Sequence, residues 1–350
     1  MSTVRTNNIL DASGGNTATI NSMTPTADSL QGFRNRIMNG GFNIAQRGTS
    51  FVSGANDDDT YNLDRWYILS DGNDAVDITQ TTTVPTGAKY SIGLDVETAN
   101  KKFGIAQIIE NVNCFDAIGQ TVTLSFDAKV SSTTKLDNVK CAIVAWSGTA
   151  DSVTSDIISA WGAEGTNPTL IANATYENSP ANLNVTTSFA RYTVSAAVDT
   201  SSTTNIIVFI WSDVTDTTAG DFLYITNTQL EVGSVATPFE RRDYGRELIM
   251  CQRYYQLGLR PMGYAYNTTT IQLGIQYVVP MRAAPTYGLT GALSITDGVG
   301  SFTQSSASAG SFNSVSTIGG FVSGAGNFSG MTSRYSCITT NDVIYVSAEL

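Results

Sequence analysis

Residues 121–129, TVTLSFDAK, alternate apolar and polar side chains along their whole length. Successive side chains of a strand point to opposite faces. The pattern therefore predicts a strand with one buried face and one solvent-exposed face. The buried face would hold Val122, Leu124, Phe126 and Ala128. Residues 205–211, NIIVFIW, are apolar on both faces and too short for a helix in this context. They predict a central, fully buried strand, and the chain is therefore expected to build layered β-sheets.

Further strand-like runs succeed one another at short intervals and are separated by turn-forming residues. They are residues 65–70, 76–81, 92–97, 104–110, 140–146, 189–197 and 222–232. Only 14% of the residues are charged, while Thr, Ser, Gly and Asn are abundant, as in extended β-proteins with many turns. This spacing predicts an all-β sandwich over residues 33–240.

A helical period interrupts the strand pattern within residues 241–256. Tyr244, Leu248, Cys251 and Tyr255 recur at the spacing of one helical face, and Asp243 is suited to cap the first turn. We expect a short helix here that connects the sandwich to the C-terminal part of the chain.

Residues 257–350 predict a second β domain. IQLGIQYVVP and the closing DVIYVSAEL read as strands, whereas residues 289–334 are rich in Gly, Ser and Ala. Composition alone would make this stretch a flexible linker. Phe302, Phe312, Phe321 and Phe328 recur along it, however, which favours thin strands packed against partner chains.

Residues 1–32 differ from the rest of the chain. Short apolar patches surround a Ser-Gly-Gly-Asn turn, and such a segment cannot bury a core of its own. It is either disordered or ordered by a partner; we favour a partner, which would make it an anchoring tail. The start of the chain lacks the apolar core of a signal peptide, and no apolar run approaches a membrane span, so no membrane insertion is expected.

Several function classes are disfavoured by composition. The chain has no histidine, which removes the commonest general base and imidazole metal ligands. The four cysteines are far apart and form no metal or redox motif, so buried reduced thiols are expected. A net charge of −11 and a pI of about 4.4 oppose nucleic-acid binding. No catalytic residue is assigned and no enzymatic activity is expected, although glycoside hydrolysis by a pair of strand carboxylates remains an alternative.

Two kinds of binding residue stand out. Asp57, Asp58 and Asp59 form the densest acidic group, which suits either a structural Ca²⁺ or an exposed acidic turn; no other cofactor is expected. Sugar binding needs exposed aromatic faces with polar partners. We therefore predict ligand contacts at Trp161, which lies in a loop-like segment, and at a tyrosine-rich surface in the last domain formed by Tyr264, Tyr266, Tyr277 and Tyr287.

A resemblance to a known family comes from four motifs. NRIMNGGFNIAQRGTSF at residues 35–51 is followed by YNLDRWYI, and TNTQLEVGSVATPFERRDYGRELIMCQRYYQ lies near the other end of the same module. Together with the C-terminal VSAEL, they resemble tail fibres and other receptor-binding appendage proteins of tailed bacteriophages. The leader resembles the segment by which such fibres attach to the virion.

The resemblance implies a jelly-roll module similar to carbohydrate-binding modules, assembled as a homotrimer. It also implies attachment of residues 1–32 to a phage tail or baseplate protein, and a tip, residues 257–350, that binds host surface polysaccharide or a surface protein. The protein would then belong to the virion and be assembled in the host cytoplasm. A glycan-cleaving tailspike and a purely structural collar or baseplate component remain alternatives.

Overall fold

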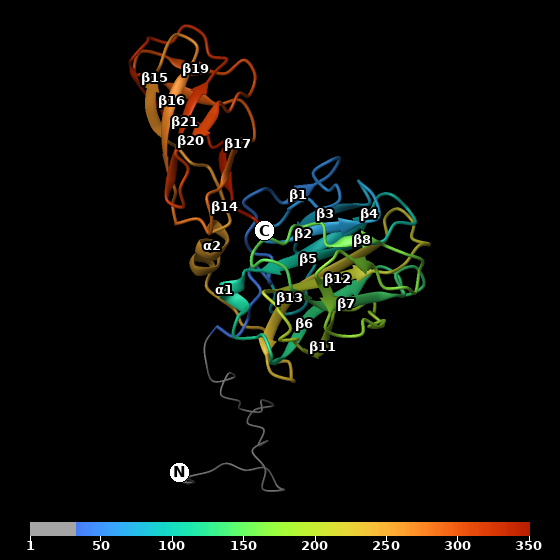
Figure 1. The fold of residues 1–350 in the computed structure, drawn as a ribbon. Helices are drawn as coiled ribbons and strands as arrows, with labels where there is room; N and C mark the ends of the chain where they lie inside the picture. The colour runs from blue at the N-terminus through green and yellow to red at the C-terminus, as the bar shows by residue number, and fades with distance from the viewer. Residues whose placement is uncertain (1–32) are drawn as a thin grey trace, which may run out of the picture. The chain divides into compact units, whose positions relative to one another are not determined.

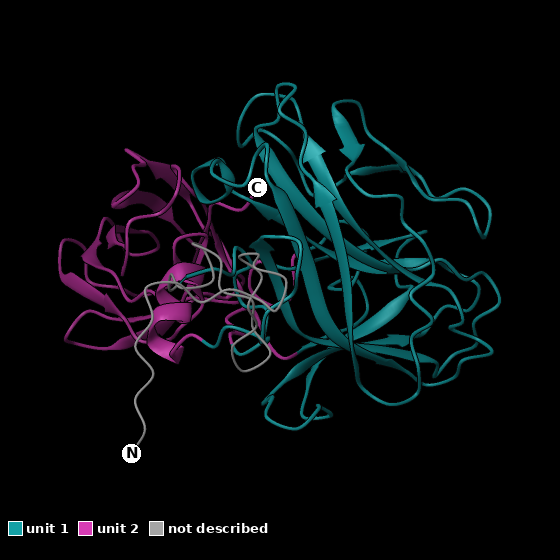
Figure 2. Ribbon diagram, turned by 90° about the horizontal axis from the view of Figure 1, so that it is seen from below, with its two compact units in different colours: residues 1–43, 50–60, 66–241 teal, residues 44–49, 61–65, 242–350 magenta. Residues whose placement is uncertain are grey.

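The computed structural model describes residues 33–350, so the predicted anchoring segment, residues 1–32, lies outside the described residues. These residues form two compact units (Figure 2). Unit 1 holds residues up to 43, together with 50–60 and 66–241; unit 2 holds 44–49, 61–65 and 242–350. The C-terminal unit therefore includes two short segments from the N-terminal part of the chain.

Unit 1 is a sandwich of two antiparallel sheets (Figure 1). The six-stranded sheet has the order β1 (Ser50–Phe51), β3 (Val76–Thr81), β4 (Ser91–Val96), β13 (Phe222–Val232), β6 (Thr121–Val130) and β11 (Ala190–Ala197). The five-stranded sheet has the order β10 (Ala174–Tyr176), β7 (Val139–Trp146), β12 (Asn205–Ser212), β5 (Phe103–Ile109) and β2 (Tyr67–Ser70). From β5 to β7 and from β11 to β13 successive strands alternate between the sheets, as in a jelly roll.

The all-β fold class is confirmed, and the long strands lie at the residues where the sequence pattern predicted them. Val122, Leu124, Phe126 and Ala128 are buried, as predicted. The solvent-facing side predicted for the same strand is only partly correct, because Thr121, Asp127 and Lys129 are at least partly exposed but Thr123 is 1% exposed and Ser125 is fully buried. Thr123 Oγ1 donates to the Gly233 carbonyl oxygen at 2.7 Å, and a side-chain hydrogen bond from Arg191 reaches Ser125 Oγ.

The first and last parts of unit 1 are joined by hydrogen bonds to β13. Arg36 N donates to the Leu230 carbonyl oxygen at 2.8 Å, and Asn35 Nδ2 donates to the Thr228 carbonyl oxygen at 3.1 Å. The two motifs near the ends of the module therefore lie side by side, although about two hundred residues separate them in the chain.

Short elements complete unit 1. The helix α1 (Asn111–Cys114) follows β5, and β8 (Ile158–Ala160) pairs with β9 (Thr169–Leu170). The sequence pattern missed these pieces because a strand of two or three residues shows no periodicity.

Unit 2 begins its main segment with α2 (Tyr244–Gln252), the helix expected within residues 241–256. Asp243 caps it, since its Oδ1 accepts from Arg246 N at 3.0 Å. The predicted helical face is only partly correct. Cys251 is buried, but Tyr244 is 62% exposed and Tyr255 lies beyond the helix in a strand.

The remainder of unit 2 consists of two antiparallel sheets. The three-stranded sheet has the order β14 (Tyr255–Leu257), β23 (Ile344–Ser347) and β17 (Thr286–Leu289). The seven-stranded sheet has the order β19 (Ser301–Thr303), β18 (Ser294–Thr296), β22 (Ser336–Thr339), β15 (Met262–Ala265), β16 (Ile271–Gln276), β21 (Gly319–Ala325) and β20 (Ser311–Asn313).

The Gly/Ser-rich stretch 289–334 thus forms strands, as predicted. Phe302 and Phe312 pack against the core of unit 2, and Phe328 belongs to it with 3% of its surface exposed. Phe302 and Phe312 are only partly buried, and packing of this stretch against partner chains stays a prediction.

Within residues 33–350, neither helix is long and apolar enough to span a membrane. The four cysteines are buried free thiols, as predicted.

Candidate functional site

Trp161, the predicted sugar platform of unit 1, packs against the protein itself. Its ring lies 6.0 Å from that of Phe209, which in turn stacks on Trp211 at 4.5 Å with an interplanar angle of 7°. Phe209 and Trp211 are fully buried on β12, and Trp161 is half-buried. Part of the Trp161 ring remains open, so its ligand role stays a prediction.

Buried charges hold the loop that carries Trp161. Asp213 forms ion pairs with Lys102 and with Lys140, the latter at 2.7 Å between Nζ and Oδ2. Gly165 N donates to Asp213 Oδ2 at 3.0 Å, and Lys102 Nζ donates to the Ala163 carbonyl oxygen at 2.8 Å. The loop therefore covers the end of the five-stranded sheet through specific bonds, which gives Trp161 a structural role.

The four predicted tyrosines of unit 2 separate into two pairs. Tyr277 belongs to the core with 7% of its surface exposed, and Tyr287 packs on Phe312 with ring centroids 5.1 Å apart. Burial raises the pKa of each of these hydroxyls to about 12. Tyr264 and Tyr266 are 41% and 58% exposed. The structure therefore brings only Tyr264 and Tyr266 together at the surface.

Tyr264 lies at the centre of an open sheet face. Directly paired residues of neighbouring strands project from the same face, so strand register defines which side chains share it. One row crosses all seven strands and contains Asn313, Phe321, Gly274, Met262, Ile338, Thr296 and Ser301. A second row contains Ser311, Ser323, Gln272, Tyr264 and Ser336. We call these two rows the open face.

The opposite face of the same sheet is buried. Leu273, Val322 and Ile295 alternate with residues of the open face and are fully buried in the core of unit 2. On the open face, by contrast, Met262 is 69% exposed and Ile338 46% exposed. Large apolar side chains therefore lie in solvent at the middle of this sheet, beside Tyr264.

The open face carries no formal charge. The seven strands, as the structure describes them, contain no Asp, Glu, Lys or Arg. At its margin, Arg260 is paired with Asp342 at 2.6 Å, and the exposed Arg334 lies two residues before Ser336. The Tyr264 hydroxyl forms a hydrogen bond with Gln272 Oε1. Hydroxyl and amide groups thus surround the apolar centre.

Sequence reasoning found Tyr264 and Tyr266 but missed Met262, Ile338 and Gly274. A signal for Met262 was available, because Met262, Tyr264 and Tyr266 alternate in one short run and would share a strand face. Ile338 and Gly274 join them only through pairing of β15 with β22 and β16, which no short-range pattern reveals.

The predicted metal ligands Asp57, Asp58 and Asp59 lie in a half-buried turn of unit 1. Asp58 Oδ1 accepts from Ser70 N at 2.7 Å. Burial, together with the charges of Asp58 and Asp156, raises the pKa of Asp59 to about 7. Whether this turn holds Ca²⁺ stays a prediction.

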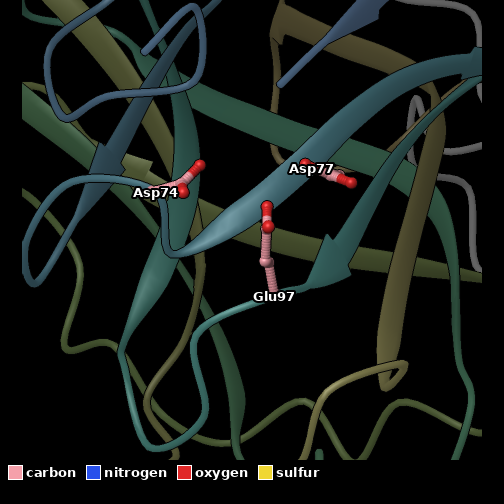
Figure 3. A group of neighbouring side chains, drawn as sticks. All are labelled: Asp74, Asp77 and Glu97. Atoms are coloured by element: carbon pink, nitrogen blue, oxygen red, sulfur yellow. The ribbon is translucent and has the colours of Figure 1, made fainter. Parts of the chain in front are cut away.

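A different set of carboxylates converges in unit 1. Asp74, Asp77 and Glu97 each place one oxygen so that the three lie within 4.8 Å of one another (Figure 3). They come from the turn before β3, from β3 and from the residue after β4. The pKa of Glu97 is raised because it shares a hydrogen bond with Asp77 and is repelled by Asp77 and Asp74. Three such oxygens could hold a hard cation.

Comparisons with known proteins give weak structural likenesses. No protein-family model and no curated protein matches the sequence. The enzymatically active domain of bacteriophage CBA120 tailspike protein 4 is 17% identical, with 57% of this chain and 22% of that chain covered and a TM-score of 0.33. The chain thus spans about a fifth of that tailspike domain.

Two carbohydrate-binding modules show similar values. The tandem CBM22-1–CBM22-2 domain of Paenibacillus barcinonensis Xyn10C is 9% identical, with 92% of each chain covered and a TM-score of 0.33. A family 16 carbohydrate-binding module is 14% identical, covering 44% of this chain and 84% of that one, with a TM-score of 0.28. At these values the likenesses do not establish a function for this chain.

Proposed function

We propose that this protein is a receptor-binding fibre of a tailed bacteriophage. Residues 1–32 attach it to the tail or baseplate, and the open face of unit 2 binds a host surface glycan or surface protein. The observation that carries the binding role is the exposure of Met262, Tyr264 and Ile338 at the centre of one sheet face. Contiguous exposed apolar side chains commonly mark an interaction site.

The binding role is tested by adsorption of the full-length protein to susceptible cells. Tyr264→Ala should weaken adsorption at least tenfold, because aromatic residues at the centre of a binding face contribute most of its affinity. Tyr244→Ala is the matched control, since Tyr244 is more exposed than Tyr264 but lies on α2. Adsorption of Tyr264→Ala equal to that of the unaltered protein would show that the open face is not the receptor site.

Assembly as a homotrimer in the virion is part of the same proposal. It rests on the resemblance of the end motifs and leader to tail fibres. Light scattering of the purified protein should give three times the mass of the chain, and a monomer mass would refute trimerisation.

We propose no catalytic step. The alternative of a glycan-cleaving tailspike draws on the convergent carboxylates Asp77 and Glu97, because glycosidases use two carboxyl groups at close range. Incubation with host polysaccharide should release no reducing ends; release that is lost in Asp77→Asn would support the alternative. A collar or baseplate role would instead leave the protein unable to adsorb to any susceptible strain.

A further inference from the structure

We infer that the ligand of the open face is an uncharged polysaccharide, an inference that rests on the receptor-binding function proposed above. The chemistry of the two rows defines this class. Apolar and aromatic side chains lie at the centre, and hydroxyl and amide side chains extend to both edges.

Charge is the first reason. No strand of the seven-stranded sheet contains an ionisable Asp, Glu, Lys or Arg. A ligand with carboxylate, sulfate or ammonium groups would lose solvation over these rows and meet no opposite charge on the strands themselves, since the exposed Arg334 lies only at the margin. The net charge of −11 on the chain further disfavours polyanionic ligands.

Hydrogen-bonding capacity is the second reason. Ser, Thr, Asn and Gln side chains both donate and accept, as the hydroxyl groups of a sugar do. The rows supply Ser311, Ser323, Gln272 and Ser336 around Tyr264, and Asn313, Thr296 and Ser301 at the ends of the longer row. Each sugar hydroxyl can therefore find a complementary neutral partner.

Shape is the third reason. Gly274 lies between Phe321 and Met262 in the longer row, and a Cβ atom placed on it would approach nothing nearer than the Met262 carbonyl oxygen at 4.0 Å. The missing side chain leaves a depression between two large apolar neighbours, where the C–H face of a sugar ring can pack. Seven strands spaced ~4.8 Å apart make the row roughly 29 Å long, enough for several linked sugars.

The test uses surface polysaccharide from a strain to which the full-length protein adsorbs. The polysaccharide is separated by anion exchange into neutral and acidic fractions, and each is used to compete with adsorption. The neutral fraction should inhibit adsorption, with less than a twofold change in potency between 50 and 500 mM NaCl. Inhibition by the acidic fraction alone, weakened by salt, would overturn the inference while leaving the receptor-binding function in place.

A blocking variant locates the site. Gly274→Leu fills the depression without a clash and should weaken binding of the neutral fraction at least tenfold. Gly245→Leu is the matched control, because Gly245 is exposed on α2 and its nearest neighbour, Asp243 Oδ1, lies 3.5 Å from the new Cβ position. If Gly274→Leu binds the neutral fraction as tightly as the unaltered protein does, the proposal that the glycan binds at Gly274 on the open face is overturned.

Other occupants of the face give distinct results. Loss of adsorption after protease treatment of the cells, with no inhibition by either fraction, would identify a surface protein and overturn the inference. A smaller oligomer mass for Gly274→Leu would identify a second copy of the chain as the occupant. If neither Tyr264→Ala nor Gly274→Leu alters adsorption, the proposed receptor-binding function itself is wrong.

Discussion

Residues 39–42 form a tight turn that packs closely against the backbone of β13. Phe42 N donates to the Asn39 carbonyl oxygen at 2.9 Å, which closes the tight turn that the Asn-Gly-Gly sequence predicts. The sequence did not reveal why Gly stands at position 40. A Cβ there would lie 2.0 Å from the Thr228 carbonyl oxygen, so the glycine is needed for the close approach of two distant backbone segments.

Gly40→Ala should therefore destabilise unit 1 by roughly 2–4 kcal/mol, because the added methyl group meets backbone that cannot move freely. Gly41→Ala is the control. Its Cβ would meet the Asn43 side-chain nitrogen, 2.9 Å away, and a side chain can rotate aside. All four tryptophans belong to unit 1, so urea unfolding followed by tryptophan fluorescence reports on this unit. Equal stability of the two variants would contradict the steric explanation.

Asp59 provides a pH-dependent test at the same scale. Its pKa of about 7 in the folded protein exceeds the ordinary value of 3.8, so ionisation opposes folding as the pH rises through this interval. Asp59→Asn should raise stability at pH 8, by about 1–2 kcal/mol after solvent screening, and leave it nearly unchanged at pH 3. Asn also tolerates the backbone φ of 65° at this position.

The same variant examines the predicted Ca²⁺ site. If residues 57–59 bind Ca²⁺, added Ca²⁺ should stabilise the unaltered protein but not the Asp59→Asn variant. With Ca²⁺ at pH 8, the unaltered protein should then be the more stable of the two. Thermal unfolding at pH 3 and pH 8, with Ca²⁺ and with EDTA, distinguishes Ca²⁺ binding from the effect of the raised carboxyl pKa alone.

At the scale of elements, periodicity predicted the long strands and failed where tertiary contacts decide. β3 and β13 have the predicted bounds. The alternation of β3 reflects one buried face, whereas β13 is buried on both faces over most of its length. Thr123 and Ser125 look solvent-exposed in sequence, but polar groups from distant segments cover them. For the same reason, the polarity of Tyr277 and Tyr287 gave no sign that they lie in or against the core while Tyr264 remains open.

The loop that carries Trp161 depends on the buried charges at one end of the five-stranded sheet. Asp213 and Lys102 are fully buried, and Lys140 is 5% exposed. Asp213→Ala would leave two buried ammonium groups without their counter-charge, so it should cost about 3–5 kcal/mol of unfolding free energy. It should also release Trp161 from Phe209, which a red shift in tryptophan emission would report.

The matched control is an exposed ion pair. Lys135 and Asp216 lie 3.1 Å apart with side chains 38% and 60% exposed, so Asp216→Ala should cost less than about 1 kcal/mol. A similar loss in both variants would show that burial of the Asp213 charges does not matter to stability.

At the scale of the whole molecule, the division into units could not be predicted from the sequence. Residues 44–49 and 61–65 read as part of the sandwich, yet they belong to unit 2. Arg47 pairs with Glu349 at 3.0 Å and lies 3.7 Å from the centre of the Tyr255 ring. Arg65 also pairs with Glu349 and lies 3.7 Å from the centre of the Tyr254 ring. One carboxylate at the end of the chain thus joins two early segments to unit 2.

Glu349→Ala should destabilise unit 2 by about 3–5 kcal/mol, because Arg65, with a side chain 2% exposed, would remain buried without its carboxylate. Asp342→Ala removes the exposed partner of Arg260 in the same unit and should cost less than about 1 kcal/mol. Hydrogen exchange of β14 and β23 measures the effect directly. Unchanged protection in Glu349→Ala would show that this ion pairing does not hold unit 2 together.

The discontinuous chain path of unit 2 limits how this unit can be exchanged between related proteins. A recombination event near residue 241 would transfer Tyr254, Tyr255 and Glu349 but leave their arginine partners with the recipient. Such a hybrid would fold only where the recipient already carries compatible residues at 47 and 65. A graft of unit 2 must therefore include residues 44–65 as well as 242–350, and the exchangeable segment is longer than the seven-stranded sheet that it carries.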